Sequence, residues 1–230
     1  MAYPPRAMTR EQLLTVFRLL YDAYGPQSWW PGNGVLEVIV GAILTQRTSW
    51  TNAERALDLL RRAGLLSLAR LRDAAPESIR RAVRPAGCYR EKTEKLRRFA
   101  KAVEERAGGD LAAFLGLPMD RLRMELLSIR GIGPETADAI LLYAAEKPSF
   151  VVDAYTRRLF ERLGCLEGGE SYDGIRDAFM RALEPDVALF NEFHALVVRH
   201  GKSHCRVVPS CSGCPVGALC VRPPGEEAWG

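Results

Sequence analysis

Long apolar runs are missing from this chain, although 47% of its 230 residues are hydrophobic. No stretch of about 18 consecutive apolar residues occurs, so a membrane-spanning helix is not expected. The opening residues Met1-Ala-Tyr-Pro-Pro-Arg also lack the apolar segment of a secretory signal. We therefore expect a cytoplasmic protein without a membrane partner, in which one large or two small domains enclose an ample core.

Strand signals are equally scarce. Regular alternation of apolar and polar residues is absent, and only residues 149–152 form a short extended run. Helix signals take their place, including capping boxes at residues 9–12 and 51–54 and a long charged segment over residues 90–107. The sequence therefore predicts an all-α fold with short connections.

Excess charge of one sign is also small, because the formal net charge is only +4. The stretch from Arg80 to Lys101 is an exception, since it holds nine basic residues and two acidic ones. Such a stretch is either a solvated helix face or a surface that binds a polyanion. Composition alone leaves both interpretations open.

Cysteine is rare outside one short segment. Cys88 and Cys165 stand alone and are expected to behave as small apolar residues. The other four have the spacing C-x5-C-x2-C-x5-C and are Cys205, Cys211, Cys214 and Cys220. Because cytosolic thiols stay reduced, this cluster indicates a metal centre rather than disulfides. The spacing favours a [4Fe–4S] cluster, with a four-cysteine zinc site as the alternative.

A glycine hairpin is the most informative motif. Gly131-Ile-Gly133 separates two predicted helices, of which the second begins at Pro134. Backbone N–H groups at such a helix N-terminus suit a phosphate. Twenty residues past Gly133, Asp153 ends the apolar run that begins at Phe150. A phosphate clamp near a half-buried carboxylate suggests an enzyme that grips a nucleic-acid backbone and attacks the nucleotide.

The hairpin, the acid and the cysteine segment together resemble the endonuclease III branch of the helix-hairpin-helix (HhH-GPD) DNA glycosylases. The resemblance covers about residues 9–220, although the first gap between the clustered cysteines is x5 here and usually x6 in that family. It implies two lobes with a DNA cleft between them. A six-helix barrel lobe would comprise residues 26–133. Residues 1–25 with 134–230 would form the lobe that carries the [4Fe–4S] loop at 205–220.

The resemblance also implies roles for single residues. Asp153 would be the catalytic acid, Gln46 would fill the space left by a flipped base, and the four clustered cysteines would hold the [4Fe–4S] cluster. Contacts to the DNA backbone would come from Gly131, Gly133, Pro134, Thr136 and Lys202. The expected protein is a base-excision-repair hydrolase that acts as a monomer on damaged double-stranded DNA, nucleoid-associated in a prokaryote.

Glu135 occupies the position at which bifunctional members of this family have a lysine. That lysine attacks the sugar and forms a Schiff base, which a carboxylate cannot do. We therefore predict a monofunctional glycosylase with weak or absent AP-lyase activity. Glu135 itself is either a first-turn helix acid or a group near the substrate. Asp138, the weaker catalytic candidate, is expected to face solvent or cap a neighbour.

The damaged base is suggested by Trp29-Trp30-Pro31. This segment either packs at a hinge or forms an aromatic pocket for a flipped, positively charged base. It resembles the 3-methyladenine glycosylase subgroup, as do Thr45-Gln46-Arg47-Thr48 and Glu135, so alkylated purines are the predicted substrates. Excision of oxidised pyrimidines or mismatched bases is one alternative, and a non-catalytic damaged-DNA-binding protein is another. His194 and His200 are interpreted as packing or surface residues.

Overall fold

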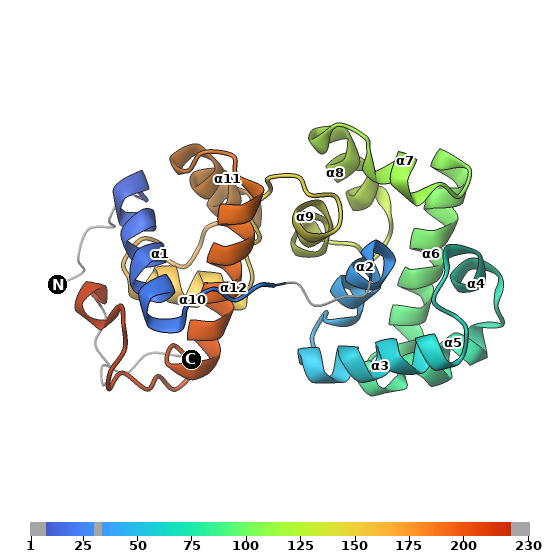
Figure 1. Cartoon of the computed structure of the whole chain (residues 1–230), viewed down its shortest axis with the longest axis horizontal. Helices are drawn as coiled ribbons and strands as arrows, with labels where there is room; N and C mark the ends of the chain where they lie inside the picture. The colour runs from blue at the N-terminus through green and yellow to red at the C-terminus, as the bar shows by residue number, and fades with distance from the viewer. Residues whose placement is uncertain (1–7, 30–33, 222–230) are drawn as a thin grey trace. The chain divides into compact units, whose positions relative to one another are not determined.

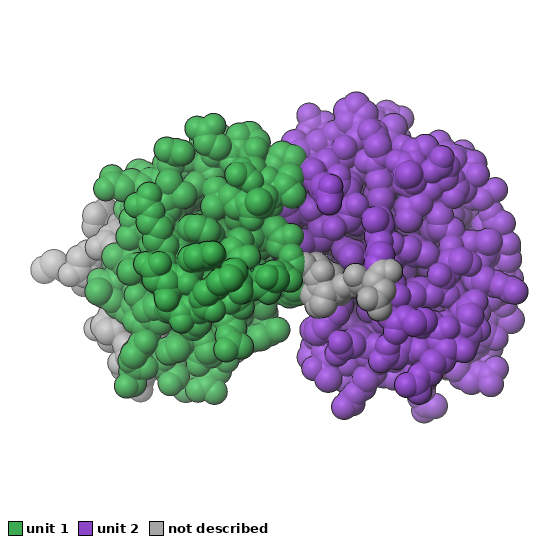
Figure 2. All heavy atoms as spheres, viewed as in Figure 1, with its two compact units in different colours: residues 1–29, 148–230 green, residues 30–147 purple. Residues whose placement is uncertain are grey.

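Residues 8–29 and 34–221 are described by the computed structural model, and every regular element among them is a helix (Figure 1). The predicted all-α class is confirmed. No helix in this part of the chain is long and apolar enough to cross a membrane. Two compact units are present, residues 1–29 with 148–230 and residues 30–147, which Figure 2 colours separately.

The unit boundaries differ from those predicted, lying at 29/30 and 147/148 rather than at 25/26 and 133/134. The larger shift concerns α9 (Pro134–Tyr143), the second hairpin helix. This helix packs on α2 (Val35–Leu44) and α8 (Met119–Ser128), so it belongs to the unit of residues 30–147.

A single long helix organises the unit of residues 30–147. This helix, α6 (Tyr89–Ala107), contacts α2 and several shorter elements. Those elements and the other helices of the unit are α3 (Trp50–Arg62), α4 (Leu68–Asp73), α5 (Pro76–Val83), η1 (Arg84–Ala86) and α7 (Leu111–Leu115). Lys92 on α6 is only 2% exposed, and its Nζ donates to the carbonyls of Leu44 at 2.9 Å and Ala86 at 2.6 Å. Its ammonium therefore caps the C-terminal end of α2.

Phenylalanines fill the core of the other unit. Its helices are α1 (Arg10–Tyr24), α10 (Ala154–Arg162), α11 (Tyr172–Ala182), α12 (Val187–Ser203) and η2 (Gly217–Leu219). The α12 helix packs on α1 and α10. Five phenylalanines with no exposed surface lie at the centre, namely Phe150, Phe160, Phe179, Phe190 and Phe193. The rings of Phe150 and Phe179 stack with centroids 3.9 Å apart.

Helix starts agree with the sequence at one predicted capping box and differ at the other. Thr9 caps α1, with both hydrogen bonds of the box to Gln12 present. The prediction for residues 51–54 is wrong, because α3 begins at Trp50 and Ser49 is its cap, accepting from the Asn52 N–H at 3.4 Å.

Candidate active site

The glycine hairpin joins α8 to α9. The turn is closed by the Ile132 N–H, which donates to the Ile129 carbonyl at 2.9 Å, and Pro134 is the first residue of α9. Gly131 has φ of 100°, and a Cβ there would come within 2.7 Å of the Lys95 side chain. Glycine is therefore required at this position for both its backbone conformation and its space. Glu135 is exposed in the first turn of α9.

A buried ion pair fastens the two hairpin helices together. The Asp138 side chain on α9 has no exposed surface, and its two oxygens accept from Arg123 of α8 at 2.9 and 3.0 Å. The prediction that Asp138 faces solvent or caps a neighbour is therefore wrong. Its bidentate pairing indicates a structural role in holding the hairpin.

Gln46 is bound to the hairpin in the turn after α2. Its Nε2 donates to Thr136 Oγ1 at 2.7 Å and to the Gly131 carbonyl at 3.2 Å. Its Oε1 accepts from Lys95 Nζ at 2.6 Å, and Lys95 also pairs with Glu91 at 2.7 Å. One hydrogen-bond network therefore joins three predicted site residues, Gln46, Gly131 and Thr136. Lys95 of α6 orients the Gln46 amide, and the sequence alone does not single out this lysine.

Asp153 is the N-cap of α10. One carboxylate oxygen, Oδ1, accepts from the Thr156 N–H at 2.8 Å and from Thr156 Oγ1 at 3.0 Å. The other, Oδ2, lies 3.5 Å from His194 Nε2. Burial alone raises the pKa of Asp153, but the hydrogen bond and charge of His194 and the two bonds from Thr156 outweigh it, so the pKa lies below its ordinary value. The carboxylate is therefore ionised at neutral pH.

His194 links this carboxylate to an aromatic ring. The residue is 4% exposed on α12, and its imidazole lies parallel to the Trp29 ring, with centroids 5.8 Å apart and 4° between the planes. The interpretation of His194 as a mere packing or surface residue did not anticipate its place beside Asp153. A lone histidine in an apolar helix carries no signal that separates the two roles.

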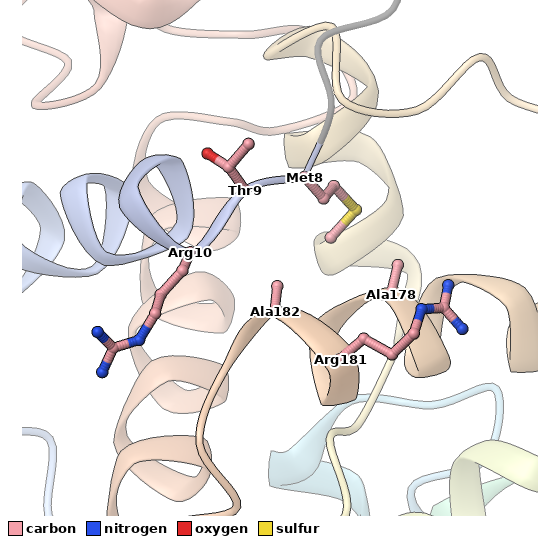
Figure 3. A pocket seen from close by; sticks show the side chains of 6 residues that line it. All are labelled: Met8, Thr9, Arg10, Ala178, Arg181 and Ala182. Atoms are coloured by element: carbon pink, nitrogen blue, oxygen red, sulfur yellow. The ribbon is translucent and has the colours of Figure 1, made fainter.

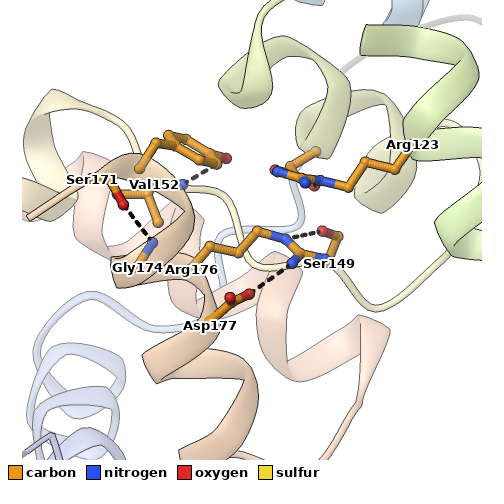
Figure 4. A network of polar contacts seen from close by, with 9 residues as sticks. Arg123, Ser149, Val152, Ser171, Gly174, Arg176 and Asp177 are labelled. Carbon is orange, nitrogen blue, oxygen red and sulfur yellow. Dashed lines mark hydrogen bonds and ion pairs between the residues drawn. The ribbon is translucent and has the colours of Figure 1, made fainter.

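The extended segment before Asp153 is held by α11, as Figure 4 shows. Arg176 Nε donates to Ser149 Oγ at 3.0 Å, and the Val152 N–H donates to the Tyr172 hydroxyl at 3.4 Å. Arg176 also pairs with Asp177 at 3.1 Å. These contacts fix the backbone that leads into the α10 cap.

The loop of residues 205–220, which we call the cysteine loop, is held by hydrogen bonds from α10. Arg162 donates to Cys205 Sγ at 3.2 Å and to the carbonyls of Arg206 and Val207 at 2.8 and 3.0 Å, while its own carbonyl accepts from the Val221 N–H at 3.0 Å. Both ends of the loop therefore meet at one residue.

Burial raises the pKa of the Cys214 thiol, and the nearby Cys211, Cys205 and Cys220 thiols raise it further. No group of three or more His, Cys, Asp or Glu residues in the described part of the chain is arranged to hold a metal ion.

The predicted site residues thus form separate groups. Gln46, Gly131, Gly133, Pro134, Glu135 and Thr136 belong to residues 30–147. Trp29, Asp153, Lys202 and the four clustered cysteines belong to the other unit, with Lys202 exposed in the last turn of α12. Trp30 and Pro31 lie outside the described residues. A surface hollow of about 590 Å³ lies elsewhere, and Figure 3 shows its lining residues Met8, Thr9, Arg10, Ala178, Arg181 and Ala182.

Comparison with known proteins identifies relatives across most of the chain. Residues 40–185 match the family described as HhH-GPD superfamily base excision DNA repair protein. A Methanocaldococcus jannaschii protein, named as a candidate DNA repair glycosylase, is 42% identical over 212 residues, 92% of this chain and 96% of the relative. Endonuclease III of Sulfolobus acidocaldarius is 28% identical over 188 residues, 81% of each chain.

Solved structures give the same grouping. The 3-methyladenine DNA glycosylase of H. pylori, bound to 1,N6-ethenoadenine, has a TM-score of 0.73 at 26% identity, covering 84% of this chain and 97% of that one. An endonuclease III–DNA complex has a TM-score of 0.79 at 19% identity, covering 93% and 95%. At 19% identity, the similarity to the endonuclease III–DNA complex concerns the fold alone.

Proposed function

The chain belongs to the HhH-GPD superfamily of base excision DNA repair proteins, and from this membership we propose that it is a monofunctional DNA N-glycosylase for alkylated purines such as 3-methyladenine. Membership accounts for the coarser statements: the helix-hairpin-helix glycosylase fold, DNA as partner and a glycosylase activity in base excision repair. The base removed, the absence of strand cleavage and the roles of single residues are the proposal.

Asp153 carries the proposed chemistry. As the base departs, positive charge develops on the sugar, and an ionised carboxylate held in a largely buried site stabilises that charge more strongly than water does. The Asp153 side chain is 14% exposed, so it is not wholly enclosed by the protein. The same group can orient or deprotonate the water that attacks the sugar.

Glu135 is the observation that carries the monofunctional assignment. It stands exposed in the first turn of α9, where an imine-forming lysine would be needed. Two lysines of the unit of residues 30–147 already make other contacts. Lys92 Nζ is buried against the carbonyls of Leu44 and Ala86, and Lys95 Nζ binds Gln46 and Glu91.

Alkylated purines are favoured by the Trp29 ring, which lies parallel to His194, the neighbour of Asp153. A purine cation is attracted to the face of an electron-rich ring, and Trp29 offers such a ring. A positively charged base is also a good leaving group, so the site needs no strong general acid. The 26% identity with a 3-methyladenine glycosylase supports this choice, whereas relatives named endonuclease III support excision of oxidised pyrimidines as the second candidate.

The four clustered cysteines are proposed to hold a [4Fe–4S] cluster. The donor set is chemically suitable, because four thiols within residues 205–220 match the ligands of such a cluster and the Arg162 guanidinium donates to Cys205. When bound, the cluster would supply a rigid cross-link for the loop. Arg206 and Lys202, both exposed beside Cys205, would then face a phosphate backbone from a fixed position.

Purified protein assayed on duplexes that contain 3-methyladenine, thymine glycol, a uracil mismatch or an abasic site tests the proposal. We expect release of 3-methyladenine without strand nicking. Efficient nicking of the abasic duplex would contradict the monofunctional assignment, and excision of thymine glycol alone would favour the second candidate. Glu135→Gln should remain unable to nick, whereas Glu135→Lys tests whether an amine at this position introduces cleavage. Binding of all four duplexes without any excision would leave only a damage-binding protein.

A further inference from the structure

His194 lies between two residues of the proposed site. Its Nε2 is 3.5 Å from Asp153 Oδ2, and the Trp29 ring lies parallel to its imidazole. All three residues belong to one compact unit. Burying an imidazole to 4% exposure is costly unless polar groups lie close to its nitrogen atoms, and the Asp153 carboxylate lies within ion-pair distance of Nε2.

The contacts of the Asp153 carboxylate leave it little freedom. A carboxylate offers about four lone-pair positions. Thr156 occupies two of them on Oδ1 through its N–H and its hydroxyl, and His194 approaches Oδ2. One position on Oδ2 is left over from these contacts. Because contacts to both oxygens hold the plane of the carboxylate, the remaining lone pair points in a fixed direction. A sugar or a water molecule can approach the carboxylate along that direction.

We propose that His194 is a positioning residue that fixes the orientation of the Asp153 carboxylate and couples that orientation to the position of the Trp29 ring. The inference rests on the proposed role of Asp153 in glycosidic bond cleavage. Stacking on Trp29 sets the plane of the imidazole, and that plane directs the Nε2 edge toward Oδ2. A base held against Trp29 would therefore influence the orientation of the carboxylate through His194.

Two substitutions separate positioning from packing. His194→Leu keeps an apolar side chain of similar size and removes the donor, whereas His194→Gln keeps an N–H group at a similar reach. We expect His194→Leu to reduce the single-turnover excision rate by about 10- to 100-fold, the range of one hydrogen bond to a charged group. The His194→Gln variant should recover most of this loss. Affinity for DNA containing an abasic analogue should change little in either variant.

The matched control is Val197→Ala, which removes buried volume from the same helix three residues away. It should lower the thermal midpoint without changing the excision rate of the folded protein. A second readout needs no substrate. The pKa of the Asp153 carboxyl, followed by NMR, should rise in His194→Leu and return toward the wild-type value in His194→Gln. Equal rates and equal Asp153 pKa values in wild type and His194→Leu would overturn the proposal.

A double-mutant cycle tests the link to Trp29. If Trp29 acts partly through the imidazole, the rate loss of Trp29→Leu should be smaller in the His194→Leu background than in the wild type. Multiplicative losses would remove the coupling to Trp29 from the proposal. The same lesion-containing duplexes distinguish failure of the proposed function from failure of this inference. If the wild-type chain excises no lesion, the proposed function is refuted. If His194→Leu excises normally while Asp153→Asn does not, only the role of His194 is refuted.

Discussion

At the scale of single residues, Asp153 combines two tasks that usually fall to different side chains. It caps α10 through Oδ1, and its charge is the one proposed to face the substrate. The cap needs an acceptor oxygen and the proposed chemistry needs the negative charge; the contacts of Thr156 and His194 favour the ionised form, which supplies both. A structural requirement and a chemical one therefore coincide in one carboxylate.

Asp153→Asn separates these tasks. Asparagine is as good an N-cap as aspartate, so the variant should fold and bind DNA. It lacks the charge, so the excision rate should fall by at least about 100-fold, the lower range for a positioned acid–base group. Single-turnover kinetics and a binding titration on the same duplex check this. Unchanged excision would remove Asp153 from the mechanism.

The depressed pKa of Asp153 also predicts a pH dependence of stability. A carboxyl group whose pKa is lower in the folded than in the unfolded state stabilises the fold at pH values above its ordinary 3.8, and this contribution is lost as the pH falls through the folded pKa. Urea unfolding of wild type and Asp153→Asn at a series of pH values measures it. Below pH 3.8 the free energy of unfolding of the wild type should fall relative to that of Asp153→Asn. A difference between the two proteins that stays constant with pH would contradict the assignment.

At the scale of elements, the hairpin depends on a pair that the sequence did not reveal. Removing Asp138 would leave the Arg123 guanidinium, which is 17% exposed at its side chain, without its carboxylate. We expect Asp138→Ala to cost about 3 kcal/mol of unfolding free energy, the lower end for a broken buried pair. Replacing both residues with leucine should cost less than the single change. Equal costs would show that the charge pairing is not what fastens α8 to α9.

The cysteine loop gives a prediction for α10. Arg162→Leu removes the donor to Cys205 and the two carbonyl contacts that hold the start of the loop. If the loop binds the proposed cluster, iron should be lost to a chelator several-fold faster in this variant. Arg157→Leu is the matched control, since Arg157 lies on the same helix and donates to the Glu170 carbonyl instead. Iron content and visible absorbance follow the loss.

At the scale of the whole molecule, the sequence predicted those features that local patterns encode. Helix class, the Gly131 turn and the cap at Thr9 depend on neighbours within a few residues, so one sequence suffices. The Arg123–Asp138 pair, Lys95 on Gln46 and His194 beside Asp153 join residues 15 to 49 positions apart. Nothing local marks these partners, because each side chain would also be acceptable on a solvated helix face. The second unit boundary likewise differs from the predicted one, because the division into compact units assigns α9 by the helices it packs on.

Because the two compact units have separate cores, loss of the proposed [4Fe–4S] cluster is predicted to destabilise them unequally. The loop of residues 205–220 contacts α10 through Arg162 and Arg158, all within the unit of residues 1–29 and 148–230. The unit of residues 30–147 has its own buried contacts, including the Lys92 cap of α2. Amide hydrogen exchange of Cys205→Ser should therefore show lost protection in α10 and the C-terminal part of α12, with α2 and α6 unchanged. Uniform loss of protection would mean that both units unfold as one cooperative body, and the proposed cluster would then stabilise the whole molecule rather than the unit of residues 1–29 and 148–230 alone.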